Sequence, residues 1–345
     1  MKKILVIGGG FAGSYIAKKL EKKFDVTLVD TKDYFEFTPG ILRTIVEPEH
    51  IKKIQIIHSH YLKKTKILIG NVKEVNKDYI KINGKKITFD YLAICSGSRY
   101  TLPIKEQNIV LTTRANHLRN YYEKLIHSKN ILIIGGGLVG VELAGEIVSK
   151  YNDKNITIVH AKYKLLERNN DKIISYATNF LKNNGVEIIY NERVISNHKT
   201  THFKTDNNKI INTDLAFWCT GIKPNFEFML KNFKESLNLQ NQVIVNEYLQ
   251  VNGQKNIFAA GDLTDRKEEK TAQNAKRQAR IVIKNIISLY KNKKLHSYII
   301  KETPKIISLG KYDGIFIFKN FVFGGLIAGI MKNLVEKKEM FFYRF

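Results

Sequence analysis

Short apolar runs alternate with longer amphipathic stretches along most of this chain. Residues 4–7 are continuously apolar, residues 11–22 follow a helical pattern, and a second apolar run ends at Asp30. Short apolar runs bounded by turns are typical of buried strands, and an amphipathic stretch between two of them is typical of a crossover helix. The pattern therefore predicts a βαβ unit of a parallel sheet at the start of the sequence.

Glycines occupy the turn between the first predicted strand and the first predicted helix, in the order GGGFAG. In such a turn the first glycine permits a sharp bend, the third admits a pyrophosphate, and the last lets the helix lie close to the sheet. The helix N-terminus offers N–H groups to the phosphates, and Asp30 at the strand tip would accept hydrogen bonds from an adenosine ribose. The glycine turn alone is a weak signal, but together with the strands, the helix and the acid it predicts a dinucleotide site. The predicted contacts are Gly8, Gly9, Gly10, Phe11, Ala12 and Gly13.

The same pattern recurs within residues 130–160. An apolar run at 130–134 leads into a second glycine turn, a helical pattern at 141–151 and a further apolar run at 156–160. Two such units in one chain indicate an internal duplication and predict two dinucleotide sites, most economically for a bound flavin and a diffusing nicotinamide nucleotide. The predicted contacts of the second turn are Gly135, Gly137 and Gly140.

The two units differ at the tip of their second strand. Asp30 of the first unit is matched by His160, and Lys162 follows two residues later. His and Lys in place of a carboxylate remove repulsion toward a 2′-phosphate and add attraction, which predicts that NADPH is accepted alongside NADH. The alternative is that Lys162 is one more solvated lysine in a lysine-rich chain.

Short strands are predicted between the two units, and a helix precedes them. The segments 67–71, 72–75, 79–82, 87–89 and 91–95 read as strands, and the last ends in a Ser-Gly-Ser turn. A strand that ends in a small turn lets the backbone approach a ligand, so Gly97 is a predicted contact. The helix that begins near residue 40 carries Arg43, for which a contact to the cofactor pyrophosphate and a solvated position are both open.

Three further segments follow the second unit. The strand predicted at 215–219 ends near Gly221 and should return the chain to the first domain. A strand at 257–260 runs into Asp262, which can direct its carboxylate at ribityl hydroxyls. A helix is predicted at 271–289, with Ala272 in its first turn. Its N-terminus and the preceding Lys270 would stabilise negative charge on a flavin.

The last segment, residues 297–345, changes character. Alternating apolar residues predict strands at 306–309 and 315–318, and residues 326–342 form a helical apolar stripe interspersed with lysines. This helix could pack on the flavin domain, lie in a membrane interface with its lysines at the headgroups, or do both.

Composition limits the classes of protein. With 345 residues, of which 43% are hydrophobic, the chain can bury a sizeable core. Two distant cysteines, Cys95 and Cys219, exclude a disulfide scaffold, fit a reducing compartment and are expected to be small core residues. The net charge of +25 predicts attraction to anions, and an anionic lipid surface or nucleic acid would both fit. We expect a cytoplasmic protein or a peripheral one on the cytoplasmic face of a membrane, without a metal site.

These motifs together resemble the flavoproteins with two dinucleotide-binding domains. Within that group the chain is most similar to the ferroptosis-suppressor and apoptosis-inducing-factor-like quinone reductases and to type II NADH:quinone oxidoreductases. The resemblance is carried by FTPGILR, GNV, SGS, GGGLVGVELAGE, FWCTGIKPN, FAAGDL and LGKYDG. It implies flavin contacts from the first glycine turn, Arg43, Val72 and Asp262, a glutamate near the nicotinamide–flavin junction at Glu142, and an aromatic near the flavin at Phe341.

The resemblance also implies the architecture. We expect an α/β protein of two Rossmann-like domains in the glutathione-reductase-like FAD/NAD(P) arrangement, with a small C-terminal α+β segment. The expected divisions are 1–103 and 225–296 for the FAD domain, 104–224 for the NAD(P)H domain and 297–345 for the C-terminal segment.

The expected reaction is transfer of a hydride from NADH or NADPH to bound FAD and of two electrons onward to a quinone. The sequence lacks the closely spaced cysteine pair of disulfide reductases, so the flavin would reduce the acceptor directly. Glu142 and Lys270 are the predicted catalytic residues. Two alternatives stay open, namely a ferredoxin or rubredoxin reductase and a basic flavin-containing module that binds nucleic acid without sequence specificity.

Overall fold

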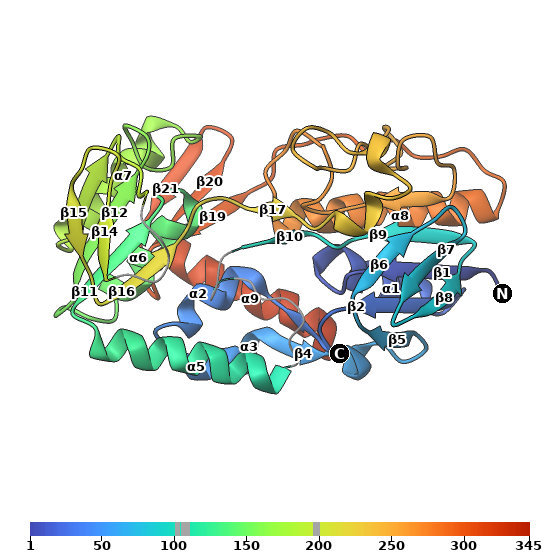
Figure 1. Cartoon of the computed structure of the whole chain (residues 1–345), viewed down its shortest axis with the longest axis horizontal. Helices are drawn as coiled ribbons and strands as arrows, with labels where there is room; N and C mark the ends of the chain where they lie inside the picture. The colour runs from blue at the N-terminus through green and yellow to red at the C-terminus, as the bar shows by residue number, and fades with distance from the viewer. Residues whose placement is uncertain (101–103, 105–110, 196–200) are drawn as a thin grey trace.

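Two parallel sheets lie toward opposite ends of the long axis of the molecule (Figure 1). The computed structural model describes residues 1–100, 104, 111–195 and 201–345. The first sheet has five strands in the order β18-β9-β1-β2-β5, and neighbouring strands are parallel. Its strands are β1 (Lys3–Ile7), β2 (Asp25–Asp30), β5 (Lys66–Ile69), β9 (Tyr91–Ile94) and β18 (Ile257–Ala259).

The second sheet repeats the first βαβ unit. Its four parallel strands have the order β13-β12-β11-β16. The strand expected at 130–134 is β11 (Asn130–Ile134), and the expected helix is α6 (Leu138–Val148), which begins and ends three residues earlier than predicted. The other elements of this region are α5 (Leu111–His127), β12 (Asn155–His160), α7 (Asp171–Asn183), β13 (Glu187–Tyr190), β14 (His202–Lys204), β15 (Ile210–Asn212) and β16 (Leu215–Trp218).

A pair of short antiparallel strands connects the two regions. β10 (Ser98–Arg99) leads the chain out of the first region, and β17 (Lys223–Pro224), paired with it, brings the chain back. The expected return to the first domain is confirmed, because β18 pairs with β9 in the first sheet. The expected boundary between residues 103 and 104 falls beside segments that lie outside the described residues.

Helices and small sheets cover the first sheet. α1 (Phe11–Leu20) and α8 (Ala272–Tyr290) pack against each other beside it (Figure 1). A three-stranded antiparallel sheet follows β5 in the sequence and matches the expected short strands. This sheet consists of β6 (Val72–Val75), β7 (Tyr79–Ile82) and β8 (Lys85–Thr88). The remaining elements between β2 and β5 are β3 (Tyr34–Glu36), α2 (Ile41–Thr44), α3 (Ile51–Ile54), β4 (Gln55–Ile57) and α4 (His58–Tyr61).

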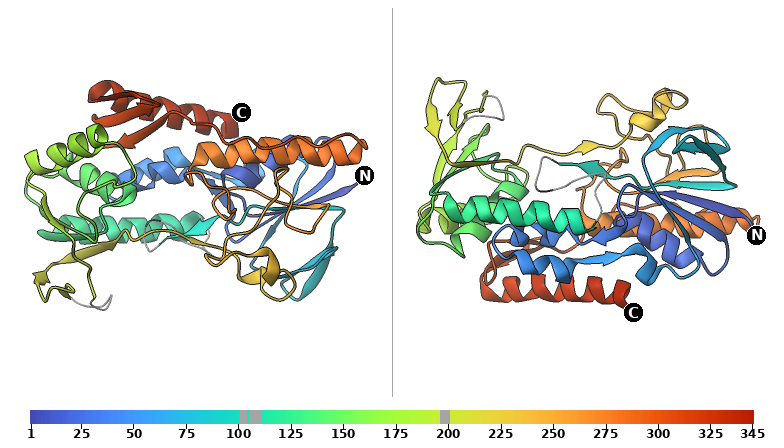
Figure 2. Two further views of the ribbon diagram at one scale, coloured as in Figure 1. Left: turned by 90° about the horizontal axis from the view of Figure 1, so that it is seen from above. Right: turned by 60° about the horizontal axis from the view of Figure 1, so that its bottom comes forward.

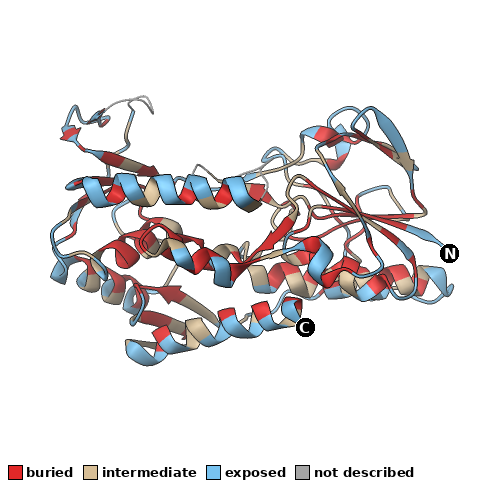
Figure 3. Cartoon of the chain, turned by 90° about the horizontal axis from the view of Figure 1, so that it is seen from below, coloured by how far each residue is buried: buried red, intermediate tan, exposed pale blue. Residues whose placement is uncertain are grey.

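The C-terminal segment bridges both regions. The antiparallel sheet of β19 (Lys305–Ser308), β20 (Gly314–Phe318) and β21 (Phe321–Gly324) lies beside the second region, and α9 (Leu326–Arg344) runs from it toward the first sheet (Figure 2). At the end of α9, Tyr343 is fully buried, and its ring centroid lies 4.1 Å from that of Phe35. The outer side of α9 is largely exposed (Figure 3). Among the described residues, no helix combines the length and apolar character needed to cross a bilayer.

Candidate active site

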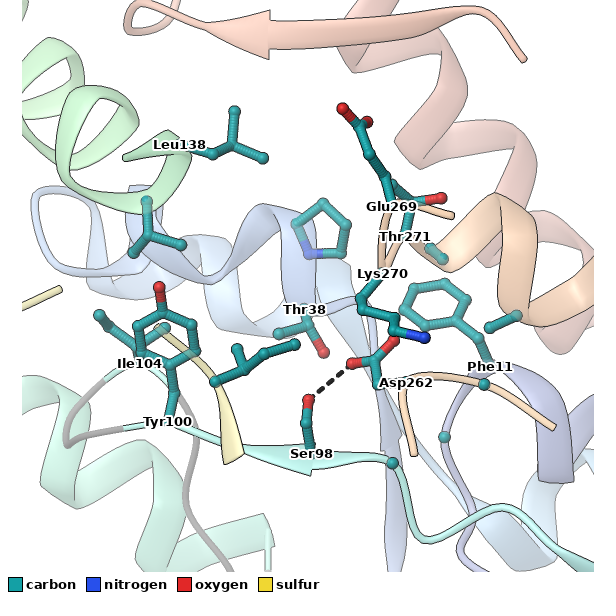
Figure 4. Close-up of a pocket in the computed structure, with 18 of the residues that line it drawn as sticks. Phe11, Thr38, Ser98, Tyr100, Ile104, Leu138, Asp262, Glu269, Lys270 and Thr271 are labelled. Atoms are coloured by element: carbon teal, nitrogen blue, oxygen red, sulfur yellow. Dashed lines mark hydrogen bonds between the residues drawn. The ribbon is translucent and has the colours of Figure 1, made fainter. Parts of the chain in front are cut away.

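One continuous cavity of about 2540 Å³ lies between the two regions. Both glycine turns line it, together with residues of α8, α9 and the β10–β17 connection. A pocket for one small molecule usually measures about 300–1,000 Å³, so this cavity has room for more than one ligand. Figure 4 shows side chains from distant segments, among them Phe11, Tyr100, Leu138 and Asp262, around this space.

The first glycine turn has the geometry that its spacing predicts. Gly8 has φ +96°, and a Cβ there would overlap the carbonyl of Cys95, which directly follows the neighbouring strand β9. A Cβ on Gly13 would overlap the carbonyl oxygen of Gly8, so only glycine lets α1 lie this close to β1. A Cβ on Gly10 would meet no described atom within 4 Å, because this residue faces the cavity.

The second turn repeats this arrangement residue for residue. Gly135 has φ +113° and lies against the carbonyl of Cys219, and a Cβ on Gly140 would overlap the carbonyl oxygen of Gly135. Gly137, like Gly10, faces the cavity with open space around its Cβ position. The duplication inferred from the sequence is therefore present in the backbone contacts as well.

The residues at the two strand tips make equivalent contacts. The Gly9 N–H donates to Asp30 Oδ2 (2.9 Å), and the Gly136 N–H donates to His160 Nδ1 (3.1 Å). Asp30 and His160 are both buried at the edge of the cavity. Sequence analysis did not find His58, whose Nε2 lies 3.0 Å from Asp30 Oδ2.

His160 does not supply the positive charge that its position suggested. Its Nδ1 accepts a hydrogen bond and so carries no proton, and burial lowers the pKa of the ring below its ordinary value of 6.5. In addition, the carboxylate of Glu167 lies 3.5 Å from Nε2 and lines the cavity, a neighbour that sequence analysis missed. The charge argument for 2′-phosphate binding then rests on Lys162, which lines the cavity as His160 does.

Glu142 lies where α6 faces the cavity. Its Oε1 accepts a hydrogen bond from the Ser308 N–H (2.9 Å) at the end of β19. Burial raises the pKa of Glu142 above its ordinary value, and the positive charge of Lys332 on α9 opposes part of this rise. A carboxyl group with a raised pKa at the wall of a ligand cavity can hold a proton at higher pH than a solvated one.

Asp262 and Lys270 also line the cavity (Figure 4). Ser98 Oγ donates to Asp262 Oδ2 (2.6 Å), and this bond joins the β10 connection to the loop after β18. Lys270 Nζ donates to the carbonyl oxygens of Thr264 (2.6 Å) and Arg266 (3.0 Å), and burial lowers its pKa. The other predicted contacts found along the cavity wall are Gly8, Gly9, Phe11, Ala12, Val72, Gly97, Ala272, Gly135 and Gly221.

Several predicted contacts lie away from the cavity. Gly13, Gly140 and Arg43 fall outside the set of described residues that line it; the two glycines act through helix packing instead. The Arg43 guanidinium is buried and donates to Glu146, Asn333 Oδ1 (2.8 Å) and the Gly310 carbonyl (3.2 Å). Phe341, the aromatic that the resemblance places near the flavin, is 64% exposed on the outer side of α9, whereas its neighbour Phe342 lines the cavity.

The two cysteines are core residues, as predicted. Cys95 and Cys219 are buried free thiols in the residues that follow β9 and β16. Burial raises the pKa of Cys219 to about 12 and that of Cys95 even further. Thiols with such pKa values are protonated at neutral pH and poor nucleophiles.

Comparison with known sequences places the chain among redox enzymes. A model of the pyridine nucleotide-disulphide oxidoreductase family matches residues 2–279. Apoptosis-inducing factor homolog A of Dictyostelium discoideum is 38% identical, over 96% of this chain and 89% of the relative. Human ferroptosis suppressor protein 1 is 29% identical, over 96% of this chain and 92% of the relative.

Solved structures confirm the fold. The sulfide:quinone oxidoreductase of Aquifex aeolicus superimposes with a TM-score of 0.84 at 18% identity, over 100% of this chain and 92% of that one. NDH2 of Plasmodium falciparum, solved in complex with NADH, gives a TM-score of 0.81 at 18% identity, over 99% and 97% of the two chains. The expected α/β architecture with two dinucleotide-binding units is therefore correct.

Proposed function

Because the chain belongs to the pyridine nucleotide-disulphide oxidoreductase family and is an oxidoreductase that uses FAD and a nicotinamide nucleotide, we propose that it reduces a quinone. In the overall reaction NAD(P)H, a proton and a quinone give NAD(P)⁺ and a quinol. The observation that carries the proposal is that both glycine turns open into one cavity, which α9 also lines. Electrons can then pass from one ligand to the other without a protein thiol.

The residues around the first glycine turn fit FAD. Gly10 leaves open space beside the N-terminus of α1, where N–H groups and the helix dipole stabilise a diphosphate. Asp30, Val72 and Asp262 line the cavity and would supply carboxylates and an apolar contact for the ribose, ring and ribityl groups. FAD held there would supply two-electron redox chemistry between the nicotinamide nucleotide and the second substrate.

The second turn would bind the nicotinamide nucleotide. Gly137 repeats the open space of Gly10 at the N-terminus of α6, and Lys162 and Gly221 line the same region. Glu142, one turn into α6, would position the nicotinamide between the two turns. Its raised pKa would let it keep a proton near the reacting groups at mildly acidic pH. Lys270, across the cavity, would stabilise negative charge on the flavin.

The C-terminal helix favours an apolar acceptor. Met331, Val335 and Phe342 of α9 line the cavity, while Leu326, Ile330 and Leu334 of the same helix are exposed by 57%, 48% and 57%. A helix with cavity-lining residues and an exposed apolar face can rest on a membrane and admit a lipid-soluble substrate. The exposed Lys337 and Lys338 and the net charge of +25 fit an anionic membrane surface.

A panel of electron acceptors tests the proposal. The purified protein should be yellow, release FAD on denaturation and oxidise NADH with ubiquinone or menaquinone analogues faster than with ferredoxin or oxygen. A colourless protein from which no FAD is recovered would overturn the proposal as a whole. A preference for ferredoxin would replace the quinone by an acidic protein partner, which the basic surface would also attract. Salt-sensitive DNA binding without NAD(P)H oxidation would favour the nucleic-acid alternative.

A further inference from the structure

A closed ring of hydrogen bonds lies behind the first glycine turn. Ser14 Oγ donates to the Gly9 carbonyl (2.6 Å) and lies 2.7 Å from the hydroxyl of Tyr61. The Tyr61 hydroxyl in turn lies 2.7 Å from His58 Nδ1, and His58 Nε2 lies 3.0 Å from Asp30 Oδ2. Asp30 closes the ring by accepting the Gly9 N–H (2.9 Å).

The side chains of the ring are buried. His58 and Ser14 are fully buried, and Tyr61 and Asp30 are 4% and 8% exposed. A Cβ on Gly9 would overlap both the Asp30 carboxylate and the His58 ring, so these groups lie directly against the turn. Buried polar atoms at such distances need a proton between each pair, because two lone pairs in contact without one would repel.

Counting protons around the ring fixes its charge. A carbonyl oxygen can only accept, so the single hydroxyl proton of Ser14 points at Gly9. The contact between Ser14 and Tyr61 must then use the tyrosine proton, and the contact between Tyr61 and the imidazole must use a proton on Nδ1. The last contact needs one more proton, so His58 and Asp30 together hold two, which makes the pair neutral rather than negative.

Two hydrogen bonds from backbone N–H groups favour the ionic form of that pair. Asp30 accepts from the Gly9 N–H at Oδ2 and from the Thr31 N–H at Oδ1 (2.7 Å), both of which stabilise a carboxylate. Burial acts to raise the pKa of Asp30, but the hydrogen bond and charge of His58 outweigh it, and this pKa lies below its ordinary value. With a carboxylate at Asp30, both protons of the pair reside on His58.

We propose that His58 is a positioning residue for FAD, held as an imidazolium that fixes both the N–H and the carbonyl of Gly9. This inference rests on the proposed function, because it assumes that the first turn binds FAD. With Gly9 held from both sides, the neighbouring Gly10 keeps its orientation toward the diphosphate. Loss of the His58 ring removes two contacts of the hydrogen-bond ring, so the turn loosens and FAD affinity falls.

Other ionisable groups surround the ring. Lys18 of α1 lies 5.9 Å from the Tyr61 ring centroid, and Tyr343 of α9 packs on the same ring at 4.9 Å. Lys32, just after β2, lowers the pKa of Asp30, and Glu21, just after α1, contributes to the raised pKa of Tyr61. The raised pKa of Tyr61 keeps its hydroxyl protonated, as the proton count requires.

Nuclear magnetic resonance of histidine-labelled holoenzyme tests the charge directly. At pH 7.5 both ring nitrogens of His58, assigned through His58→Gln, should show the shifts of an imidazolium. In Ser14→Ala the Tyr61 proton is free to turn toward Nδ1, so the ring should become neutral at the same pH. A neutral His58 ring in the wild type at pH 7.5 would overturn the inference.

FAD retention provides the second measurement. The dissociation constant of FAD should rise about tenfold or more in His58→Gln and Tyr61→Phe, in line with the cost of an unpaired buried polar group. His60→Gln, an exposed histidine of the same helix, is the matched control and should bind FAD normally. A wild type that binds no FAD overturns the proposed function, whereas equal FAD affinity with and without His58 overturns only this inference.

Discussion

The guanidinium of Arg43 lies 3.3 Å from the carboxylate of Glu146, and the exposed fractions of the two side chains are only 6% and 2%. Arg43 belongs to α2 beside the first sheet and Glu146 to α6 of the second region, so the pair joins the two dinucleotide-binding units. Burial acts to raise the pKa of Glu146, but the charges of Lys332 and Arg43 outweigh it and lower this pKa. Arg43, which the family resemblance implied as a flavin contact, thus links the two units.

Removing the carboxylate of this link should destabilise the protein strongly. Glu146→Ala leaves Arg43 buried without its negatively charged partner and should lower the free energy of unfolding by about 3–5 kcal/mol, measured by urea denaturation. Lys311 and Glu47 lie at the same 3.3 Å on the surface, and Lys311→Ala should cost only about 0–1 kcal/mol. The double variant Arg43→Met with Glu146→Met should recover most of the loss. Equal effects of Glu146→Ala and Lys311→Ala would contradict this account.

The lowered pKa of Glu146 sets the pH dependence of the link. The carboxyl binds a proton more weakly in the folded than in the unfolded chain, so its stabilising contribution is present above the ordinary pKa of 4.5. It should be lost as the pH falls through the lower pKa of the folded state. The difference in unfolding free energy between wild type and Glu146→Gln should therefore shrink on acidification, and a constant difference down to pH 3 would argue against it.

Glu142→Gln should separate cofactor binding from turnover. The variant removes the proton-holding group of the cavity wall without changing its size, so FAD content should be normal and kcat/KM for NADH about 100-fold lower. Because the pKa of Glu142 is raised, wild-type stability should fall as the pH rises above 4.5, and the variant should lack this component. Glu123→Gln on the exposed side of α5 is the control. Full activity of Glu142→Gln would remove the proposed role.

Local rules predicted the fold because each relevant constraint acts within a few residues. The spacing between Gly8 and Gly13 is fixed by the turn that both residues belong to. The close approach of the helix to the strand could therefore be predicted from the motif. The strand predicted at 79–82 is observed at Tyr79–Ile82, because alternation along a strand is a local pattern. Helix α6 of the second unit begins three residues before its predicted start, because Leu138 and Val139 continue directly from the glycine turn into helical geometry.

The parts of the site that the sequence left open depend on contacts between distant segments. Nothing near Arg43 in the chain indicates that Glu146 lies opposite, so a cofactor contact and a solvated position looked equally suitable. His58 lies in a short four-residue helix, and its significance appears only when Asp30 is placed beside it. The charge of His160 depends on a backbone N–H and on Glu167, neither of which the residue type reveals.

Nucleotide preference should respond to two opposing side chains. Lys162 attracts a 2′-phosphate, and Glu167, 3.5 Å from His160, repels one. Glu167→Gln should therefore raise the ratio of kcat/KM for NADPH to that for NADH by about tenfold, and Lys162→Ala should lower it. Lys164 pairs with Asp171 at 3.1 Å, and Lys164→Ala is the matched control. An unchanged ratio in both Lys162→Ala and Glu167→Gln would show that neither side chain reaches the 2′-position.

The exposed side of α9 should determine binding to anionic membranes. Leu326, Ile330 and Leu334 are spaced by four residues and lie on one face, and the triple change to glutamate removes its apolar contact and adds negative charge. Co-sedimentation with vesicles that contain phosphatidylserine should fall by about tenfold or more, and high salt should weaken binding of the wild type because lysines contribute to it.

Leu239, 98% exposed in a loop of the first region, provides the control variant Leu239→Glu, which should bind vesicles as the wild type does. The triple variant should still reduce a water-soluble quinone analogue while losing activity with a quinone embedded in vesicles. Equal vesicle binding of the triple variant and the wild type would mean that α9 is not the surface that meets the lipid.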